Sequence, residues 1–319
     1  MEIELAWGVI DKNLPREKVT QASKKVRKYL EKIFHLLENY NIPVTWGVLG
    51  HLLLDSCNSK LGTPHPEMPR PSYSWMKRDW YAYDPCSTLM KEPAFYGRDI
   101  IDKIVSYAQT TALPHDFACH SFSHQLFGDP GCSRAVAETE IRRCVDLMGS
   151  IYGIRPVVFI FPRNYQGHLD VLQENGFIAF RGSIPHIVPY QESIRSVLNL
   201  TQKQTSLVID MASYYFALSP PVVNPRVEHD LINIPASMCF NKKPLMPLRL
   251  VTLRAKRGID RAIKERKVFH LFMHLINLGE APDPEALIND LEEVLKYVDR
   301  RREVLEITTM RKMAEHILQ

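Results

Sequence analysis

Apolar positions along the chain follow two alternating periods. From Pro15 to Tyr40 they recur every three to four residues, which predicts an amphipathic helix that ends at the break at 41–43. Val44–Leu49 follows directly and is a short β-rich run typical of a buried strand. Similar strand-like runs lie at 116–119, 157–161, 177–180, 231–235, 268–273 and 305–308, with helical patterns at 100–108, 133–152, 168–175, 253–265 and 284–301.

This order of elements predicts an α/β fold. Strands and helices that alternate in this way form right-handed crossover units around a parallel sheet. Seven or eight strands suit a closed barrel better than an open sheet, so we expect a distorted (β/α) barrel of about seven parallel strands, with residues 1–319 as a single domain. The chemistry of such a barrel is expected at the C-terminal ends of its strands.

Two stretches interrupt the pattern. Residues 58–98 are rich in proline and aromatic residues, and residues 183–229 are irregular. Long loops within a compact domain more often carry function than serve as connections alone. We therefore interpret the first stretch as an insertion that forms part of a site.

Composition narrows the class of protein. Apolar residues make up 45% and charged residues 24% of the chain, and the formal net charge of +4 is spread along it, which argues against nucleic acid as a partner. The six cysteines include no CxxC pair, so neither a structural zinc module nor a disulfide framework is predicted. No run approaches the roughly 20 apolar residues of a membrane span, and no signal-peptide pattern is visible. We expect a cytoplasmic protein.

The strongest chemical signal is His120-Ser-Phe-Ser-His124, directly after the strand-like run 116–119. Two histidines four residues apart can bind one divalent ion, but no glutamate follows the first, so the HExxH protease pattern is absent. Two neutral imidazoles leave the ion short of charge, and a carboxylate would be the expected third ligand. A helix start with a packed histidine is the alternative interpretation.

Acidic and basic residues at other strand ends could complete such a site. Glu2 and Glu4 are two apart, so in a strand they would share one face; two exposed acids on an edge strand are the alternative. Arg163 follows the apolar run 157–161, where it could orient a carboxylate or be a plain loop residue. His274 ends the run 268–273, where an imidazole is well placed as a general acid, whereas the deeper His270 is interpreted as a core residue.

Together these stretches resemble the polysaccharide deacetylase family, the metal-dependent carbohydrate esterases that include chitin, peptidoglycan and nodulation-factor deacetylases. The likeness runs from Glu2 to about Leu278, and HSFSH is similar to the family's His-[Ser/Thr]-x-x-His metal motif. More narrowly, the stretches ELAWG, DWYAYDP, EPAFYGRDI and FPRN…GHLDVL…GF…FRG resemble a subgroup associated with surface-polysaccharide biosynthesis. The family fold is a distorted (β/α) barrel of about seven strands.

The resemblance also implies roles for individual residues. The metal ligands would be Glu4, His120 and His124, and the catalytic residues would be Glu2 as base, His274 as acid and Arg163 as the arginine that contacts the base. The family's base is normally aspartate, so Glu2 is a departure. The expected metal is zinc, with cobalt, nickel or manganese as alternatives. Substrate contacts would come from Asn164 and the ring faces of Trp75, Trp80, Tyr81 and Tyr96; for these aromatic residues, a small core within the insertion is the alternative.

The implied reaction is hydrolysis of an N-acetyl group on an amino sugar or polysaccharide precursor. Two alternatives stay open. The chain could hydrolyse a non-sugar amide, as allantoinase-like and imidase-like members of the family do, or it could bind carbohydrate without turnover.

Overall fold

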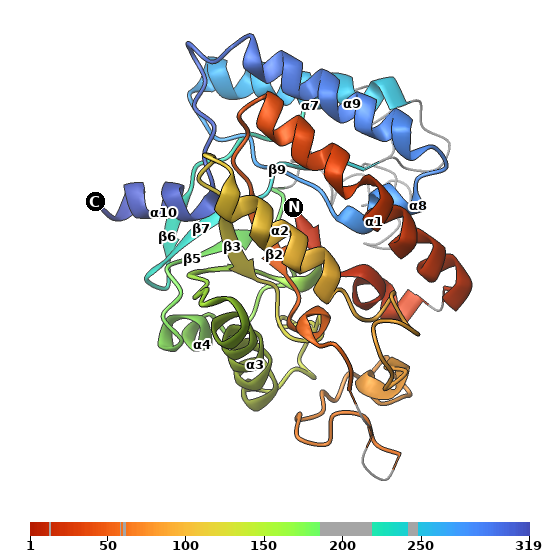
Figure 1. The fold of residues 1–319 in the computed structure, drawn as a ribbon. Helices are drawn as coiled ribbons and strands as arrows, with labels where there is room; N and C mark the ends of the chain where they lie inside the picture. Colours follow the sequence, from red (N-terminus) through yellow and green to blue (C-terminus); the bar gives the residue numbers. More distant parts are fainter. Residues whose placement is uncertain (13, 58, 60–61, 186–218, 242–247) are drawn as a thin grey trace, which may run out of the picture.

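The computed structural model describes residues 1–12, 14–57, 59, 62–185, 219–241 and 248–319. Its centre is a seven-stranded sheet with the order β1-β2-β3-β4-β5-β7-β6 (Figure 1). Neighbouring strands run parallel except β6 and β7, which are antiparallel. The strands are β1 Glu2–Ile3, β2 Thr45–Val48, β3 Asp116–Cys119, β4 Val158–Ile160, β5 Ala179–Gly182, β6 Arg226–Glu228 and β7 Leu231–Pro235.

A two-stranded sheet continues the ring of strands back to β1. It pairs β8 (Met238–Cys239) in parallel with β9 (Leu271–Phe272). Just beyond β9, His274 forms a parallel bridge with Glu2, whose amide donates to the Met273 carbonyl at 2.8 Å. Because these contacts bring β9 beside β1, the strands form a distorted barrel, and the ends of β1, β3 and β9 meet at one rim.

Helices cover the outside of the barrel. In Figure 1, α7 and α9 lie on the side of the sheet opposite α3 and α4. Ser133 caps α3 by accepting from the Val136 amide, and Gly153 ends it in a left-handed conformation with φ 68°. The helices are α1 Arg16–Asn39, α2 Arg98–Thr110, α3 Arg134–Tyr152, α4 Leu169–Glu174, α7 Leu248–Glu265, α8 Leu275–Glu280, α9 Pro284–Asp299 and α10 Met310–Leu318.

A long segment between β2 and α2, residues 54–97, contains in its described part little regular structure beyond the 3-10 turn Trp80–Tyr83. Its described part is the orange chain that extends away from the barrel in Figure 1. Trp80 and Tyr81 are nevertheless almost fully buried and belong to the same hydrophobic core as the barrel residues. The segment therefore packs against the barrel.

The structure confirms the predicted α/β barrel with a mostly parallel seven-stranded sheet. The strand predicted at 305–308 is wrong, since these residues have no regular structure, and helices α8 and α10 were not predicted. Most of the irregular stretch 183–229 lies outside the described residues. Among the described helices, none has the length and apolar character needed to cross a membrane.

Candidate active site

Two buried glutamates lie at the C-terminal end of β1. Glu2 is within the strand and 1% exposed, and Glu4, 5% exposed, follows it directly. The chain then turns at Leu5, which has a positive φ of 44°. A Cβ placed on Gly8 would lie 2.2 Å from the Glu4 carboxyl carbon, so glycine at this position leaves room for the carboxylate. The turn and the glycine together allow both acids to reach one pocket.

Arg181, in β5, holds Glu2 through a two-point ion pair. Its Nη1 and Nη2 lie 2.6 and 2.8 Å from Oε1 and Oε2 of Glu2, and the arginine is 2% exposed. Asn164 Oδ1 accepts from Arg181 Nε at 2.8 Å. Burial would raise the pKa of Glu2, but the charge and hydrogen bonds of Arg181, together with the charges of His274 and His120, outweigh it and hold that pKa well below its usual range. Glu2 is therefore ionised and fixed in orientation.

His120 and His124 converge on Glu4. Their Nε2 atoms lie 3.3 and 2.8 Å from Glu4 Oε2. The Nδ1 atom of His120 lies 2.7 Å from the Ile160 carbonyl, which can only accept, so Nδ1 donates to it and Nε2 faces the pocket. Burial lowers the pKa of His124 and favours its neutral form. The two imidazoles and the Glu4 carboxylate thus direct potential ligand atoms at one point.

The HSFSH stretch is a tight loop here, with Ser121 and His124 at φ 62° and 66°. Glu140, fully buried in α3, holds this loop from below. One of its oxygens accepts from the Phe122 and Ser123 amides at 3.0 and 2.7 Å, and the other accepts from the Ser123 hydroxyl at 2.7 Å. Loop backbone donors that would otherwise be unsatisfied are bound by one carboxylate, which fixes the positions of the two histidines.

His274, between β9 and α8, faces the same carboxylates. Its Nε2 lies 3.6 Å from Glu2 Oε2 and 3.8 Å from Glu4 Oε1, and the side chain is 25% exposed. Burial lowers its pKa, but attraction to Glu2 and Glu4 outweighs burial and raises the pKa to about 10. The ring can therefore hold a proton at the edge of the pocket.

The arginine that pairs with Glu2 is thus Arg181, whereas the resemblance had implied Arg163 as the arginine that contacts the base. Arg163 and Asn164 have φ 55° and 54° and line the pocket beside Glu4, His124 and His274. The role of Arg163 stays a prediction. Arg181 could have been noticed as a charge within the apolar β5 run, since such a charge must find a buried partner.

The predicted aromatic contacts divide into two groups. Trp80, Tyr81 and Tyr96 are 2%, 0% and 0% exposed, so the expectation that they present ring faces to a sugar is wrong: their rings are packed in the interior of the protein. Trp75 is 46% exposed, stacks on Tyr73 and lines a surface pocket with Arg163 and Asn164. It alone of the four predicted residues can offer a ring to a ligand.

Three groups of side chains among the described residues bring potential metal-binding atoms within 4.8 Å of one another. Two of them share Glu4 and form the pocket above, Glu4 with His120 and His124, and Glu2 with Glu4 and His274. The third, His51, Cys57, His65 and Asp84, is a buried cluster beneath the insertion that could also hold a metal ion. Sequence spacing had not predicted this cluster.

Comparison with known proteins gives the fold alone. No family model matches the chain, and no curated protein does. Two solved structures assigned as polysaccharide deacetylases are similar: one from Mycobacterium smegmatis (TM-score 0.54, 12% identity, 99% of this chain and 89% of that chain) and one from Pseudomonas aeruginosa PAO1 (TM-score 0.53, 13% identity, 94% and 75%). Puue allantoinase is similar too (TM-score 0.52, 13% identity, 91% and 74%).

The chain shares the fold of polysaccharide deacetylases and allantoinase. The likeness extends over nearly the whole chain and is one of fold. The narrower subgroup suggested by the sequence is supported by none of these comparisons.

Proposed function

We propose that the protein is a metal-dependent hydrolase that removes an N-acetyl group from an amino sugar or polysaccharide precursor. The observation that carries the proposal is the convergence of Glu2, Glu4, His120, His124 and His274 on one pocket at the C-terminal rim of the barrel. Catalytic sites of (β/α) barrels lie at this rim.

Glu4, His120 and His124 would hold the metal ion. One carboxylate and two neutral imidazoles are a donor set typical of a catalytic zinc site, which keeps a further position open. The hydrogen bond from His120 Nδ1 to Ile160 is the kind of outer contact that orients such a ligand. When bound, a divalent ion polarises a carbonyl oxygen and makes water more acidic.

The remaining groups move protons. Glu2 is ionised and held by Arg181, so its carboxylate can accept a proton from water, although the ion pair weakens it as a base. His274 can donate a proton to the departing amine. Glu2 Oε2 and His274 Nε2 are 3.6 Å apart, so the proton acceptor and the proton donor lie side by side at the rim.

The pocket limits the substrate. It has a volume of about 250 Å³ and is lined by Glu4, Arg163, Asn164, Phe272 and His274, among others. A small acyl group attached to one ring would suit it. Trp75 borders the adjoining surface and could stack on the next sugar of a longer substrate.

Hydrolysis of a non-sugar amide is the second candidate, supported by the likeness to Puue allantoinase and by the burial of three aromatic residues expected to contact sugar. Both reactions would use the same metal site. They differ in what is released, so the substrate panel below distinguishes them.

The test is acetate release from N-acetylglucosamine, its oligomers and nucleotide-linked N-acetyl sugars by the zinc-loaded protein, with allantoin and cyclic imides in parallel. The proposal predicts that the wild type releases acetate from at least one sugar. His124→Ala should lose both this activity and one equivalent of bound metal. Turnover of an amide or imide without acetate release from any sugar would favour the second candidate. No turnover of any compound by protein that holds its metal would overturn both.

A further inference from the structure

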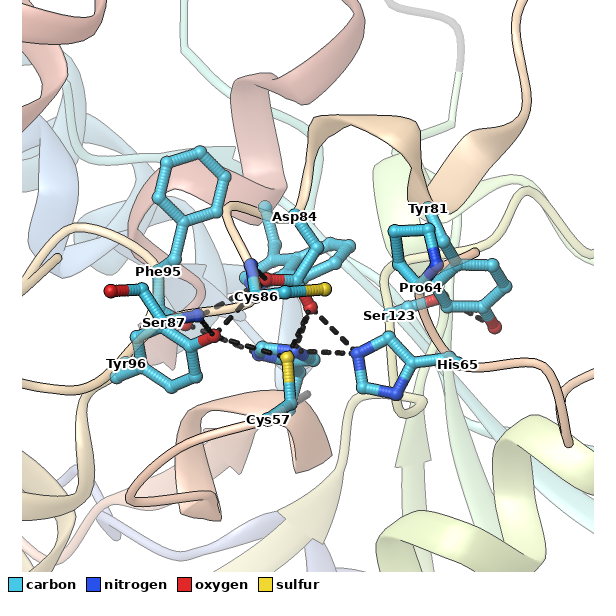
Figure 2. A network of polar contacts seen from close by, with 12 residues as sticks. Cys57, Pro64, His65, Tyr81, Asp84, Cys86, Ser87, Phe95, Tyr96 and Ser123 are labelled. Carbon is cyan, nitrogen blue, oxygen red and sulfur yellow. Dashed lines mark hydrogen bonds and ion pairs between the residues drawn. The ribbon is translucent and has the colours of Figure 1, made fainter. Parts of the chain in front are cut away.

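A second cluster of metal-binding side chains lies beneath the insertion, apart from the active-site residues. It joins His51, which follows β2, to three residues of the segment 54–97, which contains the insertion: Cys57, His65 and Asp84. Asp84 Oδ2 lies 2.7 Å from His51 Nε2, 2.6 Å from His65 Nε2 and 3.1 Å from Cys57 Sγ. Figure 2 shows Cys57, His65 and Asp84 directed toward a common point.

Hydrogen bonds orient the two imidazole rings so that their Nε2 atoms face the centre of the cluster. His51 Nδ1 lies 3.2 Å from the Phe95 carbonyl, which can only accept, so Nδ1 donates outward. His51 Nε2 is directed at Asp84 Oδ2, 2.7 Å away, and at His65 Nε2, 3.1 Å away. Two ring nitrogens and a carboxylate oxygen that meet in a buried site are placed as ligands of one cation would be.

An outer ring of contacts orients the cluster. Asp84 Oδ1 accepts from the Cys86 amide at 2.9 Å and from the Tyr96 hydroxyl at 3.1 Å, so its other oxygen, Oδ2, is free to face the centre. The same hydroxyl lies 3.1 Å from Cys57 Sγ and accepts from the Ser87 amide at 2.9 Å (Figure 2). Fixing ligands through such second contacts is a general feature of metal sites.

The donor types and their charges match zinc. Two imidazole nitrogens, one thiolate and one carboxylate form a four-coordinate set, and their two negative charges would balance one Zn²⁺ ion. Tetrahedral bonds of about 2.0–2.3 Å place ligand atoms about 3.3–3.8 Å apart. The observed spacings of 2.6–3.1 Å are slightly shorter, so a small outward movement would admit an ion.

We infer that His51, Cys57, His65 and Asp84 form a structural zinc site that fixes the insertion to the barrel. Four protein ligands leave no open position, and His51, His65 and Asp84 are 0%, 5% and 6% exposed, so the ion has no place for a substrate. The site supplies a cross-link in a segment with little regular structure, much as metal ions stabilise small folds. The inference does not depend on the proposed reaction.

The zinc site also reaches the catalytic loop. The Gly50 and His51 amides donate to the Ser121 and Phe122 carbonyls at 2.9 and 2.8 Å. The Phe122 ring packs against both His51 and His65, with ring centroids 5.4 and 5.5 Å apart. An ion that holds His51 therefore also steadies the loop that carries His120 and His124.

Cobalt substitution tests the site, because only a thiolate ligand gives cobalt(II) an intense near-ultraviolet charge-transfer band. We expect this band in the cobalt-loaded wild type and in His124→Ala, which alters the active site. We expect it to disappear in Cys57→Ser but to persist in Cys86→Ser and Cys239→Ser, two matched controls near the two sites. Cys57→Ser should also lose one equivalent of zinc, and its Tm should fall by about 5–10 °C.

Absence of the band from the cobalt-loaded wild type would overturn the inference, whether or not Cys57→Ser folds. So would a Cys57→Ser protein that keeps the band and the metal content of the wild type. Because His124→Ala removes only the other metal, failure of the zinc site and failure of the proposed hydrolase would give different results.

Discussion

Arg181 binds both carboxylate oxygens of Glu2, at 2.6 and 2.8 Å, with both side chains almost fully buried. β5 carries the arginine and β1 the glutamate, so the contact spans the barrel. The two carboxylates of the site therefore have different partners. Glu2 is fixed by an arginine, while Glu4 lies nearest to the histidines. The pair therefore separates a carboxylate suited to proton transfer from one suited to metal binding.

Arg181→Lys should lower kcat by about 100-fold while leaving the metal content unchanged. Lysine keeps the charge but gives up the two-point contact, so Glu2 can move by about an ångström. Steady-state kinetics with metal analysis would measure this. Arg163→Lys is the matched control and should mainly raise KM, because Arg163 lines the pocket. A large loss of kcat in Arg163→Lys with none in Arg181→Lys would contradict this assignment.

His274→Asn should lower kcat for an N-acetyl sugar by about 100- to 10,000-fold, since an amine leaves poorly without a proton. Hydrolysis of 4-nitrophenyl acetate should fall much less, because nitrophenolate needs no proton to leave. The ratio of the two losses is the measurement. His270→Asn serves as the control and should leave that ratio unchanged. Equal losses on both substrates in His274→Asn would argue against a general acid.

Trp75→Ala should raise KM for an oligomer about tenfold and leave both kcat and the KM for the monosaccharide unchanged. Its ring is 46% exposed beside Arg163 and Asn164, where a second sugar could stack. The comparison of KM for monomer and oligomer measures this. Met90→Ala, also exposed and in the same segment, is the control. A kcat effect of Trp75→Ala on the monosaccharide would contradict a remote stacking role.

Asp116→Asn should stabilise the protein above neutral pH. Burial raises the pKa of Asp116 from 3.8 to about 6, and Oδ1 has no hydrogen-bond partner among the described residues. The carboxyl group of Asp116 therefore holds its proton more tightly in the folded protein than in the unfolded chain. This difference stabilises the fold below pH 3.8, and the stabilisation is lost as pH rises through 6. Asparagine avoids that loss, with a gain in unfolding free energy of up to about 3 kcal/mol at pH 8 that falls by about half at pH 5.

Urea unfolding at the two pH values measures this gain, and Asp146→Asn on the exposed face of α3 is the control. A gain that did not change between pH 5 and pH 8 would show that Asp116 does not titrate as described.

The sequence predicted the parts of the fold that depend on local pattern. The helix predicted at Pro15–Tyr40 is α1, Arg16–Asn39, and the strands at 116–119 and 231–235 have the predicted bounds. The run 305–308 has strand-like residues but pairs with no strand among the described residues, and pairing decides strand formation. The two residues of β1 form a strand because Met1, Glu2 and Ile3 pair with β2 and His274.

The candidate site was predictable only in part, for a similar reason. HSFSH and the acids at 2 and 4 are local signals, and the structure brings them together. Arg181 and the cluster at Asp84 are defined by partners far away in sequence: Glu2 is 179 residues from Arg181, and Asp84 is 33 residues from His51. The prediction that no structural zinc module exists relied on short CxxC spacing, which this cluster does not use.

The most direct test compares acetate release by zinc-loaded wild type with that of Glu2→Gln. Glutamine keeps the size of the side chain but cannot accept a proton, so our account predicts acetate release from an N-acetyl sugar by the wild type and at least a 100-fold slower rate in Glu2→Gln, with equal zinc content. Equal rates in the two proteins, or no acetate from the zinc-loaded wild type with any N-acetyl sugar, would contradict it.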